Sequence, residues 1–323
     1  MVDRPRPIVE VRDLCKTFAV KHAGGVSTLH ALSGVNFDIM RGETLGLVGE
    51  SGSGKTTAGR IVVGLIPATS GAVSLFGHNI TGPDGRAQLA SVRSRLQFVF
   101  QDPFASLNPR MRIVNAIAEP LDIAGTHSRK ERSDRVAELL ELVGLPKNSV
   151  ERYPHEFSGG QRQRIVIARA LALNPDFVVC DEPVSALDVS MQAQIVNLLL
   201  DLQDRLGLSY LFIAHDLAVV RAVSTRVAVM YAGAIVETAP KAQIYSDPQH
   251  PYSRALLDAV PRADPDVVRH PVVAGEVPSL LDPPSGCCFH PRCAFALERC
   301  RVEVPLLKES GSDRRVACHL FST

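Results

Sequence analysis

One nine-residue stretch, Gly49 to Thr57, most constrains what this chain can fold into. It reads GESGSGKTT, follows the apolar run Thr44 to Val48 and precedes the apolar-rich segment Ala58 to Leu65. This order predicts a strand, a glycine loop and a helix, which is the context that a GxxxxGK[ST] pattern needs before it indicates a phosphate-binding loop. Glycines let backbone N–H groups point inward, and the helix start adds its positive dipole end. The alternative, a Gly/Ser-rich surface turn, explains neither the lysine nor the flanking elements.

Within this loop, Lys55 is expected to reach the β- and γ-phosphates of a nucleoside triphosphate, and the Thr56 hydroxyl to bind Mg²⁺. The residues predicted to bind the nucleotide here are Gly49, Ser51, Gly52, Ser53, Gly54, Lys55, Thr56 and Thr57.

A second element supplies acidic groups. The apolar run Phe177 to Asp181 predicts a buried parallel strand with its functional residue at the C-terminal end. Asp181 is expected to hold Mg²⁺ through its water shell, and Glu182, the next residue, to act as general base toward an attacking water. The alternative is that both acids only cap the turn at Pro183.

Length and charge narrow the classes of protein. The chain has 323 residues, enough for one large domain with a smaller one or for two domains. Its formal net charge of +1 argues against binding nucleic acid through bulk charge. No apolar run is long enough to span a bilayer, and the first residues lack the apolar core of a secretion signal. We therefore expect a cytosolic chain.

The periodicity predicts an α/β fold. Residues 8–48 alternate apolar and polar positions, which is typical of half-buried strands, whereas Ser209 to Ala214 is a buried strand candidate. The amphipathic helix Met191 to Leu206 lies between buried strands, so we expect a mostly parallel sheet covered by helices. Residues of about 102–160 are mainly helical in pattern. Half of the 22 prolines lie from Pro240 onward, which places a domain boundary near residue 240.

The stretch Phe157 to Gln161 predicts a second anion site, because it sets two glycines and a hydroxyl at a helix start. Two such sites in one chain cannot serve one nucleotide unless the second acts on the ATP of a neighbouring chain.

At this point residues 8 to about 240 resemble the ATP-binding cassette (ABC) ATPases. The motifs that carry the resemblance, in chain order, are GESGSGKTT at 49–57, Gln101 in FQDP, FSGGQ at 157–161, VVCDEP at 179–184, SALD at 185–188 and His215 in IAHD. The resemblance implies a P-loop NTPase core with an N-terminal antiparallel β region, a helical subdomain at about 102–160, and ATP hydrolysis. Phe157 stands where the family usually has leucine. Cys180 is interpreted as a small buried hydrophobe.

The resemblance also implies a head-to-tail dimer with two ATP molecules between facing cassettes. His215 would contact the γ-phosphate within its own chain and position the water, Gln101 would sense the metal, and Asp188 would cross the dimer interface. The residues that would contact the γ-phosphate bound by the partner are Ser158, Gly159, Gly160 and Gln161. Phe18 is the best placed aromatic to stack on adenine, with a plain core role as the alternative.

Beyond residue 240 the chain resembles the ATPase subunits of dipeptide and oligopeptide importers. The matching stretches are DPFASLNPR at 102–110, QHPYSRALL at 249–257 and PSGCCFHPRC at 284–293. The chain is then a 1–240 ABC ATPase domain with a 241–323 extension, peripheral on the cytoplasmic side of the cell membrane. Expected partners are a second, paralogous ATPase subunit, two transmembrane permease subunits and an extracytoplasmic substrate-binding protein. Alternatives are another substrate, such as nickel, or a soluble ATPase that remodels nucleic acid or ribosomes.

Five of the seven cysteines fall in the last 37 residues, and in a reducing compartment such clustering favours a metal site over disulfides. In the importer subfamily four cysteines can hold a [4Fe–4S] cluster, and the matching positions are Cys287, Cys293, Cys300 and Cys318. Cys288 lies directly beside Cys287, so either of these two thiols could be the metal ligand. Zinc and a metal-free state remain alternatives. His290 and His319 are expected at the surface or behind the ligands.

Overall fold

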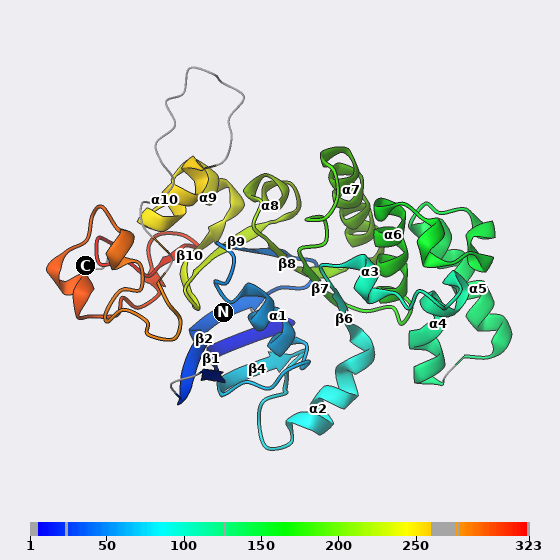
Figure 1. Cartoon of the computed structure of the whole chain (residues 1–323), viewed down its shortest axis with the longest axis horizontal. Coiled ribbons are helices and arrows are strands. Elements are labelled where there is room, and N and C mark those ends of the chain that lie inside the picture. Colours follow the sequence, from blue (N-terminus) through cyan, green and yellow to red (C-terminus); the bar gives the residue numbers. More distant parts are fainter. Residues whose placement is uncertain (1–5, 23–24, 126, 260–275, 277, 322–323) are drawn as a thin grey trace. The chain divides into compact units, whose positions relative to one another are not determined.

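The computed structural model describes residues 6–22, 25–125, 127–259, 276 and 278–321. The chain divides into two compact units. The first unit combines residues 1–89 with 214–323, and the second unit is residues 90–213. Figure 1 labels most of their helices and strands.

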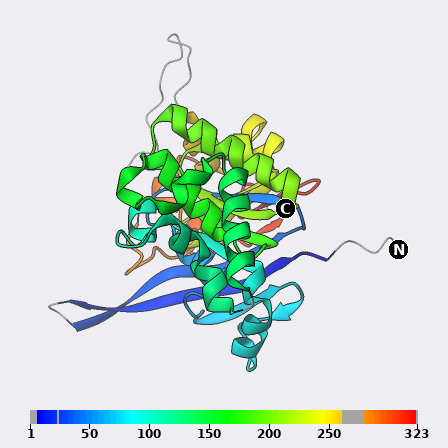
Figure 2. The same cartoon turned by 90° about the vertical axis from the view of Figure 1, so that its right-hand side faces the viewer.

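An antiparallel sheet opens the first unit, with strand order β2-β1-β4-β5. Its strands are β1 (Val9–His22), β2 (Gly25–Ile39), β4 (Ser70–Leu75) and β5 (His78–Asn79). Val9 pairs with Ile39 on one side and with Leu75 on the other, and all three side chains are buried. In Figure 2, β1 and β2 form a long ribbon. Within the predicted range of 8–48, residues 8–39 do form half-buried strands, whereas Thr44–Val48 forms a strand that is buried on both faces.

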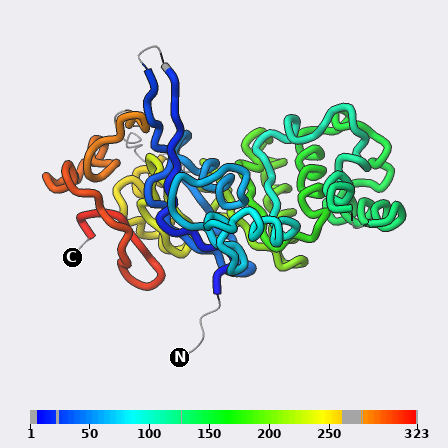
Figure 3. The backbone as a smooth tube through the Cα atoms, turned by 90° about the horizontal axis from the view of Figure 1, so that it is seen from below, coloured from blue at the N-terminus to red at the C-terminus, as the bar shows by residue number. Residues whose placement is uncertain are grey.

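A second group of strands in the first unit carries the phosphate-binding loop. In spatial order it contains β11 (Lys308–Glu309), β12 (Arg315–Val316), β10 (Ala234–Pro240), β9 (Arg226–Tyr231) and β3 (Thr44–Val48). Strand β3 runs parallel to β9, and every residue of β3 is buried. Strand β12 pairs with β10 through Glu237 and Val316. The C-terminal segment thus extends the same group of strands that precedes the loop, and Figure 3 shows this segment beside β10.

Helices cover these strands. Those within the first unit are α1 (Lys55–Val62), α8 (Leu217–Val223), α9 (Lys241–Ser246), α10 (Pro251–Asp258) and the short 3₁₀ turns η4 (His290–Arg292) and η5 (Glu298–Arg301). Helix α2 (Gly85–Val92) begins in this unit. Helix α8 packs closely on β3, because a Cβ atom on Gly46 would lie 2.5 Å from Val220 Cγ1. The close contact requires a glycine in β3.

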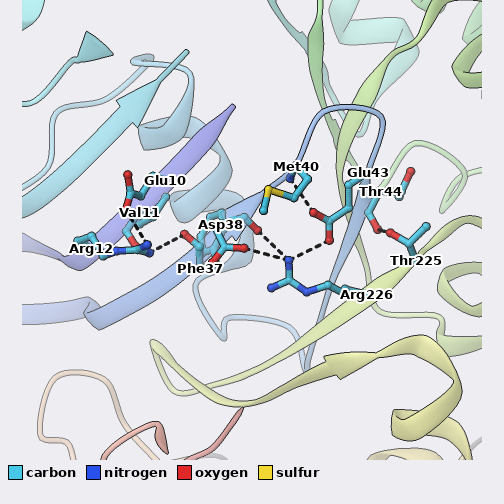
Figure 4. Close-up of polar contacts among 10 residues, drawn as sticks. All are labelled: Glu10, Val11, Arg12, Phe37, Asp38, Met40, Glu43, Thr44, Thr225 and Arg226. Atoms are coloured by element: carbon cyan, nitrogen blue, oxygen red, sulfur yellow. Dashed lines mark hydrogen bonds and ion pairs between the residues drawn. The ribbon is translucent and has the colours of Figure 1, made fainter. Parts of the chain in front are cut away.

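Arg226 joins the strands of the first unit through a polar network (Figure 4). Its Nη1 atom donates to Asp38 Oδ1 and to Glu43 Oε1, both at 3.0 Å. Glu43 also accepts from the Met40 backbone N–H at 2.7 Å. Burial raises the pKa of Glu43, and Arg226 opposes that shift. The network therefore satisfies a buried charge that would otherwise be unfavourable.

The second unit contains the parallel strands β6 (Leu96–Val99), β7 (Phe177–Asp181) and β8 (Ser209–Ala214). Its helices are α3 (Pro103–Ser106), α4 (Ile113–Ala124), α5 (Arg129–Leu142), α6 (Gly159–Ala170), α7 (Val189–Leu206) and the 3₁₀ turns η1 (Arg93–Arg95), η2 (Lys147–Glu151) and η3 (Pro154–Glu156). Ser128 begins α5 with a capping box, and Gly207 ends α7 in the left-handed conformation. Strands β7 and β8 are buried along their whole length, as their apolar runs predict.

Two further features bear on the predictions. Cys180 lies in β7 with no exposed surface, and burial raises the pKa of its thiol, so it is an inert buried side chain as expected. Among the helices of the described ranges, each is too short or too polar to cross a bilayer.

Candidate functional site

The phosphate-binding loop turns between β3 and α1 on two glycines, Gly49 and Gly54, at which a side chain would clash. Gly49 has a φ of 153°, and a Cβ there would lie 2.1 Å from the Met230 carbonyl oxygen. Gly54, at the start of α1, has a φ of 104°, and its Cβ would lie 2.6 Å from the Ala31 carbonyl oxygen. Close approach of neighbouring backbone, together with positive φ, therefore fixes the shape of the cradle.

Lys55 points into this cradle. The side chain is 5% exposed, and its Nζ atom donates to the Gly49 carbonyl at 2.7 Å and to the Glu50 carbonyl at 2.9 Å. A longer contact of 3.3 Å reaches Ser53 Oγ. Thr56 and Thr57 are half-buried in the first turn of α1, whereas Ser51 and Gly52 are exposed. The ammonium group is thus held where the loop N–H groups would place a phosphate.

Glu50, the second residue of the loop, is bound by two residues of the C-terminal segment. Its backbone N–H donates to the Tyr252 hydroxyl at 2.9 Å. Its carboxylate accepts two hydrogen bonds from Arg292, at 2.9 Å from Nη1 and 3.2 Å from Nη2. The Arg292 side chain is only 5% exposed, and the hydrogen bonds to Glu50 raise the pKa of Arg292. The sequence patterns did not predict these contacts.

Tyr252 reaches the loop because the start of α10 is built for it. His250 begins the helix, its Nδ1 accepting from the Tyr252 N–H at 3.0 Å, and Pro251 occupies the first turn. The His250 N–H donates to buried Glu237 at 2.9 Å. The Tyr252 ring packs against Tyr231 with centroids 4.6 Å apart. The HPY stretch therefore aims one hydroxyl at the loop.

Phe18, the candidate adenine-stacking residue, lies in β1 with 36% of its surface exposed. The Lys16 Nζ atom lies 4.8 Å from the ring centroid, in a cation–π contact. The ring is therefore not sealed into the core, so a planar base could reach it.

In the second unit, the structure brings Gln101 and Glu182 together. Gln101 Nε2 donates to Glu182 Oε2 at 3.0 Å. Asp181 is 2% exposed at the end of β7, and Glu182 follows it with a φ of +48°. That left-handed conformation costs a non-glycine residue about 1–2 kcal/mol, which is typical of functional positions held by their surroundings. The local backbone thus turns the Glu182 carboxylate toward Gln101.

The SGGQ stretch starts α6 as predicted. Ser158 caps the helix, with Gln161 N–H donating to Ser158 Oγ at 3.3 Å and Ser158 N–H donating to Gln161 Oε1 at 3.0 Å. A Cβ on Gly160 would lie 1.9 Å from Met191 Cε, whereas one on Gly159 would lie 3.3 Å from Leu187. A side chain at position 160 would therefore force the end of Met191 in α7 to move.

The two remaining candidates lie at helix starts. Asp188 is exposed and caps α7, accepting from the Met191 N–H at 2.9 Å. His215 is exposed between β8 and α8, next to Asp216, which caps α8. Lys55, Thr56 and His215 belong to the first unit. The predicted site residues that belong to the second unit are Gln101, Ser158, Gly159, Gly160, Gln161, Asp181, Glu182 and Asp188.

All seven cysteines are free thiols. Near the C-terminus, three other thiols act on the ionisation of Cys287. Burial and the neighbouring thiols of Cys300, Cys318 and Cys293 raise the pKa of Cys287 to about 11. Cys288 instead lies 3.9 Å from the Tyr231 carbonyl oxygen, and burial raises its pKa to about 12. Among the described residues, no three His, Cys, Asp or Glu side chains are arranged as ligands of one metal ion.

The chain matches two protein-family models. The first, described as "ABC transporter", covers residues 32–185. The second, described as "Oligopeptide/dipeptide transporter, C-terminal region", covers residues 236–300.

Curated relatives match nearly the whole chain. An ATP-binding protein of Brucella abortus (strain 2308) named for peptide import is 64% identical over 321 residues, which is 99% of this chain and 96% of the relative. One of Brucella ovis, also named for peptide import, is 52% identical over 313 residues, or 97% of each chain.

Solved structures share the cassette fold. One is a dimeric ATP-binding cassette in a post-hydrolysis state with ADP and Pi, with a TM-score of 0.64 and 30% identity, covering 72% of this chain and 98% of that one. Another is CbiO1 from Clostridium perfringens, part of an ABC transporter complex, with a TM-score of 0.63 and 26% identity, covering 75% of this chain and 91% of that one.

Proposed function

Because the chain belongs to the ATP-binding cassette (ABC) transporter family, we propose that it is the ATP-hydrolysing subunit of a peptide importer. One observation carries the substrate class: the relative that is 64% identical over 99% of the chain is named for peptide import. The match of residues 236–300 to the C-terminal region of oligopeptide and dipeptide transporters supports it. The fold alone would not do so, since one fold hosts many functions.

Each predicted site residue has its own role in this proposal. Lys55 binds the β- and γ-phosphates, and Thr56 and Asp181 hold Mg²⁺, which neutralises phosphate charge when bound. The glycine cradle fits a phosphate group, because positive φ and close backbone at Gly49 and Gly54 leave no room for a side chain there, and Lys55 supplies a cation. Glu182 accepts the proton of the attacking water, and His215 orients that water.

The contact between Gln101 and Glu182 supports pairing the metal-sensing side chain with the general base. Phe18 stacks on adenine in this proposal. The residues that complete the site on a second cassette are Ser158, Gly159, Gly160, Gln161 and Asp188.

The proposed partners follow from this role. A second cassette, here a paralogue, faces the first, as the dimeric cassette of a related solved structure suggests. Two transmembrane permease subunits receive the helical segment of about 102–160, and an extracytoplasmic protein delivers the substrate. The chain works on the cytoplasmic side of the membrane. The 1–240 and 241–323 division remains part of this proposal.

Replacing Glu182 by Gln tests the function. In cells expressing the complete transporter, we expect Glu182→Gln to abolish ATP hydrolysis and uptake of a labelled dipeptide while ATP binding persists, because the amide cannot accept the water's proton. Glu141→Gln, which removes an exposed carboxylate of α5, is the matched control and should change neither. If the transporter with Glu182→Gln takes up dipeptide at the wild-type rate, Glu182 is not the general base that drives uptake.

The same uptake assay separates the alternatives. If the transporter takes up Ni²⁺ and no peptide, the substrate is nickel and not peptide. The ATP-hydrolysing role of the chain would be unaffected. Nucleic-acid remodelling has no support in a chain of net charge +1 whose relatives are named for import.

For the C-terminal thiols, we propose that Cys287, Cys293, Cys300 and Cys318 hold a [4Fe–4S] cluster, with zinc as the alternative. Backbone N–H groups donate to the sulfurs of Cys287, Cys293 and Cys318, an environment that stabilises thiolates. The Nδ1 atom of neighbouring His319, which is 7% exposed, has no partner among the described residues. Cys288 is left out because its thiol faces the Tyr231 carbonyl.

Metal analysis tests this centre. Protein purified without oxygen should contain iron and sulfide and absorb in the visible range. Cys293→Ser should lose both, whereas Cys288→Ser, its matched control, should keep them. Zinc in place of iron would select the alternative, and metal-free protein would contradict the centre.

A further inference from the structure

We propose that Arg292 and Tyr252 are positioning residues of the ATP site: the C-terminal segment sets nucleotide affinity by holding Glu50 of the phosphate-binding loop. This proposal rests on the ATP site of the family, not on the choice of peptide as substrate. Its failure would therefore leave peptide import untouched.

The negative charge of Glu50 has to be neutralised if the loop is to bind phosphate. A carboxylate in a loop that receives a polyanionic phosphate group repels it, and the repulsion is strong where water is partly excluded. Arg292 faces this carboxylate with two parallel hydrogen bonds of 2.9 and 3.2 Å. This fork neutralises the charge and also fixes the direction of the side chain. The loop can then accept phosphate without a competing anion.

Arg292 is itself rigidly held. Its Nη1 atom donates to the Tyr231 hydroxyl at 3.3 Å, and its guanidinium lies 5.8 Å from the Tyr231 ring centroid. The turn η4 that carries it is closed by the Arg292 N–H, which donates to the Phe289 carbonyl at 3.0 Å. Phe289 packs edge-on against Tyr231 at 5.2 Å. A long side chain that is ordered in advance loses little entropy when the loop binds a ligand.

Tyr252 holds the backbone at the same residue. Its hydroxyl accepts the Glu50 N–H, and its ring is fully buried between Tyr231 and Phe289. Glu50 is thereby fixed at the main chain and at the side chain, from two places in the C-terminal segment. Ser53, three residues on, is also fixed, since its carbonyl accepts from the Gly233 N–H at 2.9 Å. The loop is held from outside before any nucleotide binds.

The test measures ATP affinity of the full chain by titration calorimetry. Arg292→Met should weaken ATP binding about tenfold, because the Glu50 carboxylate, left without its cation, would repel the triphosphate. In the assembled transporter KM for ATP should rise while kcat stays within about twofold, because the reacting groups are unchanged. Arg299→Met, which breaks an exposed ion pair with Glu303 in the same segment, is the matched control and should leave the affinity unchanged.

A double variant separates electrostatic positioning from mere structural support. If Glu50 without Arg292 repels phosphate, then Glu50→Gln combined with Arg292→Met should bind ATP more tightly than Arg292→Met alone. A structural role predicts no such rescue. Arg292→Lys, which keeps the charge but loses the fork, should lie between wild type and Arg292→Met.

Tyr252→Phe isolates the backbone contact. It keeps the packed ring and removes one neutral hydrogen bond, so ATP affinity should fall by several-fold. Thermal unfolding of each variant verifies that it is folded. The proposal is overturned if folded Arg292→Met binds ATP with wild-type affinity, or if Glu50→Gln gives it no rescue.

Discussion

At the scale of a single residue, His250 couples helix α10 to the pH of the solution. The side chain is 1% exposed, and burial lowers its pKa to about 3. Its Nδ1 must stay unprotonated to accept the Tyr252 N–H. An unfolded histidine titrates near pH 6.5, so below that pH the unfolded chain binds a proton that the folded chain excludes. Stability from this group is therefore complete above about pH 6.5 and decreases as the pH falls toward 3.

His250→Asn removes this titration while keeping a side chain that can cap a helix. The unfolding free energy of the wild type minus that of the variant should decrease by about 2 kcal/mol between pH 7.5 and pH 5.0, which is 1.5 pH units below the unfolded pKa. Urea unfolding at a series of pH values measures it. A difference that stays constant over this range would show that His250 binds a proton as readily in the folded chain as in the unfolded chain.

At the scale of an element, the phosphate-binding loop makes different demands on two of its glycines. Gly49 and Gly52 both have positive φ, but only Gly49 faces backbone. A Cβ on Gly49 would lie 2.1 Å from the Met230 carbonyl oxygen, whereas one on Gly52 would have nothing within 4 Å. We expect Gly49→Ala to lower the unfolding free energy by about 1–3 kcal/mol more than Gly52→Ala, because overlap adds to the conformational cost. Denaturant unfolding of both variants measures the difference, and equal losses would contradict it.

The elements themselves were largely predictable from the sequence. Strands β7 and β8 have the predicted bounds because each is a short apolar run between polar residues. The stretch Phe157 to Gln161 was predicted to place a hydroxyl at a helix start, and Ser158 does cap α6. Glu50, Tyr252 and Arg292 were missed as a group, since the contacts join residues 202 and 242 positions apart. Local patterns carry no information on such pairs.

At the scale of the molecule, motif order was sufficient to identify the family, because each motif marks the end of a strand or the start of a helix. The boundary near residue 240 stays a prediction. Proline content marks where periodic segments become rare, yet residues 214–323 share one compact unit with residues 1–89. Strand β12 is only two residues long, too short for any period to reveal. The roles of the individual site residues stay predictions that the variants above can test.

The pairing of β12 with β10 bears on how the protein could be shortened. A chain ending at Pro240 would lose Val316 as the partner of Glu237, along with the two N–H donors of Gln249 and His250 that this fully buried carboxylate accepts. An unpaired edge strand can pair with other chains and cause aggregation. A buried carboxylate without hydrogen-bond partners lowers the stability of the fold. Truncation at Pro240 would therefore produce an aggregation-prone, destabilised protein and not a stable, isolated ATPase domain.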